Sequence, residues 1–286
     1  MFHTLWRHRE LILSLVKRDL KTRYKASALG FFWSLCKPLL IMAILYVVFV
    51  VIVPLRFPNA YFFDANNEKA TRMAYGIHLI IGVLLWHFFA GSLSESTHSI
   101  LANGNLLKKI KMPLEVFPVS TVLANLVHLL LAWAVLFPVM LALGYRLTWM
   151  VLALPFLIAL LAVLTTGLAF FLSATNVFYR DVASITEIVL MGWFYITPIF
   201  YPASVAWAEL QRFPRVFVWM FVGNPMATLC IAIRRVVFVD GNFSRTEVAD
   251  ETFWKYLVLC LGVSVAIYGL GRLVFHRLSP RFADEV

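Results

Sequence analysis

Long apolar runs alternate with short polar segments along most of the chain. A helix that crosses a bilayer needs about 20 predominantly apolar residues, and six of the runs come close to or exceed that length. No stretch with soluble composition separates them, so we expect an all-α polytopic membrane protein with one transmembrane domain, residues 29–286. The six predicted spans are residues 29–53, 77–100, 116–143, 149–174, 182–201 and 253–275.

The first 28 residues have a different pattern and are too charged to span. Between residues 8 and 25, Leu11, Leu15 and Val16 share one helical face with Ile12 and Leu20, and basic residues occupy the rest of the surface. This distribution is typical of a helix that lies in the membrane interface. We therefore predict an interfacial amphipathic helix within residues 1–28.

Residues 202–251, between the last two spans, have a mixed pattern. Two apolar stretches, 216–222 and 226–239, are separated by Gly223, Asn224 and Pro225, and each stretch is too short to cross a bilayer. We predict a pair of short re-entrant helices on the outer side, which is possible where protein covers the irregular backbone. An amphipathic outer loop is the alternative.

Composition supports a membrane protein and indicates its orientation. Of the 286 residues, 62% are hydrophobic and 14% are charged, whereas soluble domains have about one half and one quarter. The net charge of +10 comes from lysines and arginines beside apolar runs, so nucleic-acid binding is not indicated. Fourteen basic residues flank the predicted inner ends and four lie in the two short outer loops. Both termini are therefore predicted to be cytoplasmic in a multi-pass protein of the cytoplasmic (inner) membrane.

The chain lacks the sequence patterns of a nucleotide-hydrolysing or metal-dependent enzyme. It contains no GxxxxGK[ST] loop, no HExxH and no close aspartate pair. Its three cysteines are far apart in apolar surroundings, with no metal-ligand spacing. We expect no catalytic residue, metal or cofactor in this chain. A stripe of Ser92, Glu95, Ser96 and Ser99 on the second predicted span fits either a conduit wall or helix–helix hydrogen bonding.

Several motifs, in order along the chain, resemble those of one transporter family. They are RDLKTRYKASALGFFWSLCKPLL at 18–40, NGNLLKKIKMPLEVFPVS at 103–120, NVFYRDV at 176–182, WFYITPIFYP at 193–202, GNPM at 223–226 and RLSPRFADEV at 277–286. Together they are similar to the permease subunits of polysaccharide-exporting ABC transporters, most closely the O-antigen type. The resemblance implies a homodimer that works with two copies of a separate ABC ATPase, which would bind the ATP and Mg.

The resemblance also implies two cytoplasmic elements. One is a coupling helix between the second and third spans, which matches residues 100–113. An interpretation from charge alone is that this segment is a loop that only fixes topology. The other is a gate helix after the fourth span, which matches residues 176–182. The candidate coupling residues are Asn103, Asn105, Leu106, Leu107, Lys108 and Lys109, and the candidate gate residues are Tyr179, Arg180 and Asp181.

The implied cargo is a polyprenyl-pyrophosphate-linked polysaccharide, and two residue groups fit its transport. Basic residues of the amphipathic helix could attract the lipid pyrophosphate, or serve only as positive-inside anchors. Aromatic residues at the end of the fifth span offer weak sliding contacts to sugar rings, or are interface anchors. The first group is Arg18, Lys21, Arg23 and Lys25, and the second is Trp193, Phe194, Tyr195, Phe200 and Tyr201.

Other functions remain open on sequence alone. The exported glycan could be a capsule, a teichoic acid or a galactan instead of O-antigen. A membrane enzyme acting on lipid-linked sugars would need a paired-carboxylate site. A secondary transporter would show inverted repeats and charges at the membrane midplane. The sequence shows no paired-carboxylate site, no inverted repeats and no charges at the midplane.

Overall fold

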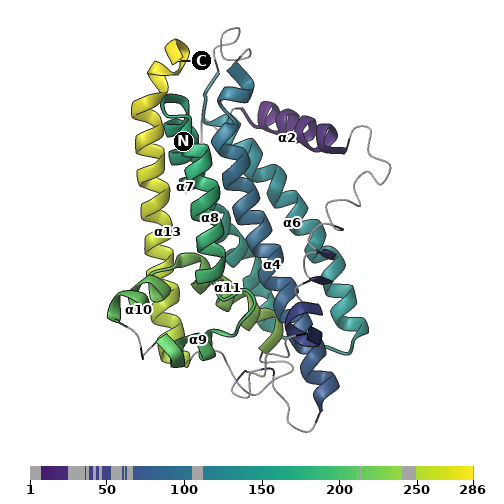
Figure 1. Cartoon of the computed structure of the whole chain (residues 1–286). Coiled ribbons are helices and arrows are strands. Elements are labelled where there is room, and N and C mark those ends of the chain that lie inside the picture. The colour runs from purple at the N-terminus through teal and green to yellow at the C-terminus, as the bar shows by residue number, and fades with distance from the viewer. Residues whose placement is uncertain are drawn as a thin grey trace.

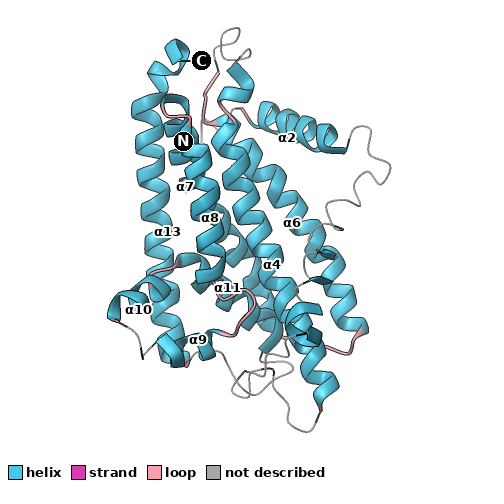
Figure 2. Ribbon diagram, viewed as in Figure 1, coloured by secondary structure: helices cyan, strands magenta, loops and turns pink. Residues whose placement is uncertain are grey.

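The computed structural model consists of helices and connecting loops, and no strand occurs in the part of the chain that it describes (Figure 2). It describes residues 8–24, 36, 39–40, 43–44, 47–52, 60, 62, 67–104, 112–210, 212, 214–239 and 249–285. Most of the first predicted span therefore lies outside the described residues, apart from fragments such as the π-helix Val47–Ile52. The same holds for Lys25, Asn105, Leu106, Leu107, Lys108 and Lys109, and for the side chain of Arg23.

Four long helices form the body of the structure (Figure 1). They are α4 (Glu68–His98), α6 (Val116–Ala142), α7 (Leu154–Phe178, extended by the 3₁₀ turn Trp149–Ala153) and α13 (Asp250–Leu278). Each is long and apolar enough to cross a membrane. They coincide with the predicted second, third, fourth and sixth spans, so an all-helical chain with several candidate spans is confirmed. The total of six stays a prediction.

Helix α8 (Asp181–Ile196) occupies most of the predicted fifth span but ends before Tyr201. Its 16 residues extend about 24 Å, less than the hydrocarbon core of about 30 Å. The helix stops because Thr197 is extended (φ −81°, ψ 134°) immediately before Pro198, and a residue that precedes proline is driven out of the helical region. Residues 197–201 therefore form an irregular segment.

Three short helices follow that segment: α9 (Ala203–Leu210), α10 (Arg215–Val222) and α11 (Pro225–Arg234). Asn224 caps α11, because its Oδ1 accepts from the amides of Met226 (3.0 Å) and Ala227 (3.3 Å). The two predicted apolar stretches are thus helices separated at the predicted turn, while their entry into the membrane stays a prediction. Sequence patterning missed α9, although Pro202 directly before it is a helix-start signal.

Helix α2 (Arg9–Tyr24) lies across the long helices at the end where the chain also terminates (Figure 1). Its buried side chains Ile12, Leu15 and Val16 join a cluster with Val116 and Phe117 at the start of α6. A helix is thus present where the amphipathic helix was predicted, and its apolar face packs on protein, while its position in the membrane interface stays a prediction. We call this end of the molecule the α2 end. The opposite end carries α9, α10 and α11 (Figure 1), and we call it the α9 end.

Helices α7 and α13 cross in close contact. A Cβ atom added at Gly271 of α13 would meet the carbonyl oxygen of Gly167 in α7, and one added at Gly167 would lie 2.5 Å from the Cα of Tyr268. Small residues at such a crossing let two helix backbones approach each other, which increases their van der Waals contact. The pair of glycines therefore fixes the position of α13 against the rest of the bundle.

Candidate functional site

At the α2 end, a candidate lipid-attracting residue touches a candidate coupling residue. The Nη2 of Arg18 donates to Oδ1 of Asn103 at 3.0 Å, and it also pairs with Asp19 at 3.2 Å. The Nδ2 of Asn103 donates to the carbonyl oxygen of Ser99 at 2.8 Å, so the turn after α4 is held to its own helix. Lys21 is exposed on the same helix as Arg18. The structure thus joins α2 to the start of the predicted coupling segment.

The predicted gate residues lie where α7 turns into α8. Residues 176–178 complete α7, Tyr179 is extended, and α8 begins at Asp181, so the described chain turns here without a separate short helix. Tyr179 is 71% exposed, and Arg180 and Asp181 are exposed as well. Asn176 anchors this junction, because its Nδ2 donates to the carbonyl oxygen of Thr97 in α4 at 2.9 Å.

The polar stripe on α4 packs against neighbouring helices. Ser92, Ser96 and Ser99 are buried, and the hydroxyl of Ser99 donates to the carbonyl oxygen of Ser96 at 2.7 Å. Glu95 accepts from Nδ2 of Asn125 in α6 at 2.8 Å. The Glu95–Asn125 bond joins α4 to α6 and supports the hydrogen-bonding interpretation at Glu95, whose side chain is also exposed.

The five predicted conduit aromatics lie close together but differ in exposure. The indole of Trp193 donates to Oδ1 of Asn224 at 2.9 Å and stands edge-on to Phe89. Phe194 packs on Trp86 and on Phe200, with ring centroids 5.5 and 6.2 Å apart. These three aromatic residues are therefore part of the packed fold.

Tyr195 and Tyr201 are arranged differently. The side of α8 that carries Tyr195 is open, and Tyr195 is 60% exposed. The hydroxyl of Tyr201 donates to the carbonyl oxygens of Tyr195 (3.0 Å) and Ile196 (3.1 Å), so Tyr201 caps the last turn of α8. Tyr195 is the one of the five with a largely open ring.

Arg234 is a structural centre that motif reasoning did not identify. Its side chain is fully buried at the α9 end. Its Nη1 donates to the carbonyl oxygen of Pro198 at 2.5 Å, and its Nη2 donates to those of Ile199 (2.7 Å) and His78 (3.1 Å). Gly82 leaves room for the guanidinium, because a Cβ there would collide with Nη2. An arginine within an apolar segment is the sequence signal that could have identified it.

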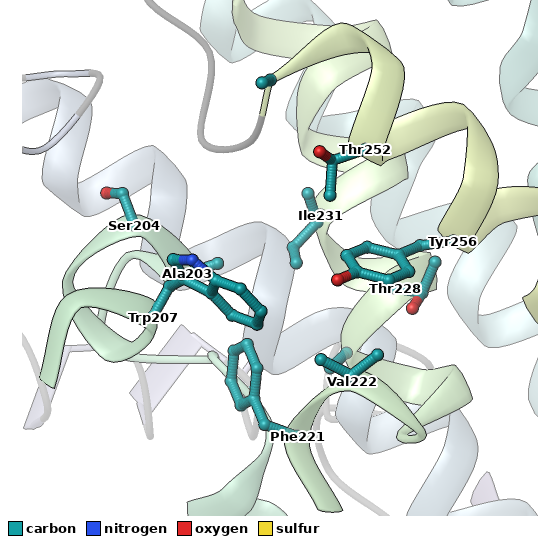
Figure 3. A pocket seen from close by; sticks show the side chains of 11 residues that line it. Ala203, Ser204, Trp207, Phe221, Val222, Thr228, Ile231, Thr252 and Tyr256 are labelled. Carbon is teal, nitrogen blue, oxygen red and sulfur yellow. The ribbon is translucent and has the colours of Figure 1, made fainter. Parts of the chain in front are cut away.

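A cavity of about 310 Å³ lies among α9, α10, α11 and α13 (Figure 3). Its walls include Trp207 of α9, Phe221 of α10, Thr228 of α11 and Tyr256 of α13. Phe221 also borders a second hollow of about 370 Å³, which Tyr201 lines from the other side. Neither hollow was expected from sequence, because several separate helices contribute residues to each one.

Comparisons with known proteins agree with the motif resemblance. The family described as ABC-2 type transporter matches residues 10–238. Among similar proteins, the O-antigen export system permease protein RfbA of Klebsiella pneumoniae is 28% identical over 277 residues, covering 96% of this chain and 94% of that protein. The RfbA protein of Myxococcus xanthus is 29% identical over 282 residues, covering 99% of this chain and 97% of its own length. The chain therefore belongs to the ABC-2 type transporter family.

Proposed function

We propose that this protein is the permease subunit of an ABC transporter that exports a polyprenyl-pyrophosphate-linked polysaccharide, of the O-antigen type, across the cytoplasmic membrane. The observation that carries the proposal is similarity over nearly the whole chain to proteins named O-antigen export system permeases. ATP hydrolysis would take place in a separate subunit that binds ATP and Mg, because this chain has no phosphate-binding loop.

The α2 end is the proposed cytoplasmic side, where the ATPase would dock on residues 100–113. Asn103 is bonded to α4 through Ser99 and to α2 through Arg18. Packed helices shift as units, so a force applied to this turn would move α4 and α2 together. The bonds around Asn103 thus give the proposed coupling segment a direct mechanical link to the membrane part.

The substrate would approach along α2. Arg18 and Lys21 of this helix are exposed at the α2 end, and each basic residue near such a surface contributes about 1 kcal/mol to the attraction of anionic headgroups. Because Arg18 also bonds to Asn103, an arriving pyrophosphate would compete for a guanidinium that holds the coupling turn. Substrate arrival and ATPase docking would then affect each other.

The polysaccharide would pass between two copies of the chain, along the open side of α8. Ile185, Ile188, Met191 and Tyr195 are exposed on this helix, while Thr186 and Leu190 are its buried residues. Glu187 is also exposed on α8, one turn before Met191. Beyond it the side is apolar and aromatic, and it offers sugar rings weak contacts with their C–H faces. Such a wall suits a cargo that has to slide.

The proposal is tested by deleting the gene for this chain in the cell from which the chain comes. We expect surface polysaccharide to disappear and its lipid-linked precursor to accumulate on the inner side, with recovery when the chain is restored. The sugar composition of the accumulated precursor identifies the glycan. Unchanged surface polysaccharides, or hydrolysis of lipid-linked sugar by the purified chain alone, would contradict the proposal.

A further inference from the structure

The cavity among α9, α10, α11 and α13 has aromatic rings on facing walls (Figure 3). The indole of Trp207 and the ring of Phe221 lie beside each other on one wall. Tyr256 projects from α13 on the opposite wall, and its hydroxyl points towards Trp207. Thr228 and Thr252 add hydroxyl groups to the lining. The volume of about 310 Å³ is at the lower end of the range of small-molecule sites.

The lining indicates an uncharged ligand. Among the described residues that form the cavity there is no Asp, Glu, Lys, Arg or His. An ionised group placed here would lose its hydration without gaining a counter-charge, which is strongly unfavourable. The described lining therefore favours a neutral ligand over an ionised one.

The hydroxyl groups favour a sugar over a hydrocarbon chain. A lipid tail would cover the hydroxyls of Thr252 and Tyr256 without offering them a hydrogen bond, and burying polar groups in that way costs free energy. A pyranose ring offers both kinds of contact, since its C–H faces pack on aromatic rings and its hydroxyls exchange hydrogen bonds. Aromatic walls with a few hydroxyls match that combination.

We propose that this cavity binds one neutral sugar unit of the exported glycan. The inference deepens the proposed export function and rests on it. The hollow that Tyr201 lines shares Phe221 with the cavity. Through this hollow the cavity adjoins the aromatic end of α8. A unit held here, at the α9 end, would keep the glycan from slipping back between transport steps.

The test measures binding of the glycan to the full chain assembled with its partner ATPase in phospholipid nanodiscs. The probe is the host's own surface polysaccharide, freed of lipid by mild acid and cut to short oligosaccharides, and binding is followed by saturation-transfer NMR. We expect Trp207→Ala to weaken binding about tenfold, because the affinity depends on few stacking contacts. Trp254→Ala is the control, since Trp254 is exposed nearby on α13 and does not line the cavity.

The Tyr256→Phe variant distinguishes a bound sugar from a bound lipid tail. It also remains a test of the proposal if the Trp207→Ala variant fails to assemble. It removes one hydroxyl and keeps the ring, so we expect weaker oligosaccharide binding and unchanged retention of lipids in native mass spectra. Oligosaccharide binding that is absent in the wild type, or equal in wild type and both variants, would overturn the proposal. Loss of a bound lipid in Trp207→Ala with unchanged oligosaccharide binding would overturn it too, in favour of a tail site. The export function itself would still stand if the gene deletion removes surface polysaccharide.

Discussion

The guanidinium of Arg234 donates a hydrogen bond to the carbonyl oxygen of Pro198, 2.5 Å away, across 36 positions of the chain. Pro198 lies in the irregular segment that follows α8, where backbone carbonyls have no helical partner. The same guanidinium bonds to Ile199 and to His78 of α4. One buried side chain therefore satisfies carbonyl groups of the segment after α8 and joins that segment to both α4 and α11.

We expect Arg234→Met to destabilise the protein strongly. The change removes this donor from the carbonyl oxygens of Pro198 and Ile199, which lie outside any helix, and each buried group left unsatisfied costs about 1–3 kcal/mol. The measurement is the midpoint of thermal unfolding in detergent, followed by size-exclusion chromatography. Arg212→Met is the control, because Arg212 makes an exposed ion pair with Glu209 that contributes about 0–1 kcal/mol. Equal midpoints for the two variants would show that the Arg234 bonds do not hold the α9 end together.

The crossing of α7 and α13 gives a second prediction. Gly271→Ala places a methyl group against the carbonyl oxygen of Gly167, and such overpacking costs about 1–3 kcal/mol. The unfolding midpoint should fall. Gly269→Ala, two residues earlier on the same helix, meets nothing within 4 Å and should leave the midpoint unchanged or raise it slightly. Equal midpoints for the two variants would contradict the predicted clash at the α7–α13 crossing.

The long helices could be predicted from sequence because apolar length is a local property. The predicted third span, 116–143, agrees with α6 (Val116–Ala142) to one residue. The end of α8 was less predictable: Pro198 signals a stop, but aromatic residues continue the apolar run to Tyr201. Only the folded chain shows that Arg234 makes an irregular segment stable there, because its partners are 35, 36 and 156 positions away.

The candidate site was predictable to a similar extent. Sequence reasoning grouped Trp193 with Tyr195 because they are neighbours in one aromatic run. The structure separates them, since the indole of Trp193 bonds to Asn224 whereas Tyr195 is exposed. A helix turns by about 100° per residue, so neighbours in sequence point in different directions, and burial depends on which helices pack alongside.

Topology gives a third prediction. In a background without Cys36, Cys230 and Cys260, single cysteines at Asn66 and at Thr148 should react with a membrane-impermeant maleimide added outside intact cells. A cysteine at Asn105 should react only after the cells are opened, because positive charge keeps its loop inside. Labelling of Asn105 from outside would reverse the proposed orientation.

The fourth prediction concerns the coupling segment. Replacing Leu106 and Leu107 together with Asp should release or uncouple the ATPase, because it places charge in an apolar contact. Replacing both with Met keeps the contact apolar and should preserve function. The measurements are co-purification of the partner, its ATPase rate and surface polysaccharide. If the Asp variant retains complex and export, the segment only fixes topology.

Tyr195 provides the sharpest test of the aromatic path, because its ring is 60% exposed whereas Trp193 has a structural hydrogen bond. We expect Tyr195→Ala to lower surface polysaccharide severalfold while membrane level and ATPase assembly stay normal, since sugar rings lose a sliding contact. Tyr195→Phe keeps the ring and should keep most of the export. Trp149, 78% exposed at the α9 end, is the matched anchor control, and Trp149→Ala should have little effect. If Tyr195→Ala and Trp149→Ala both lose protein from the membrane without a specific export defect, the Tyr195 ring is an interface anchor, and the glycan follows another path.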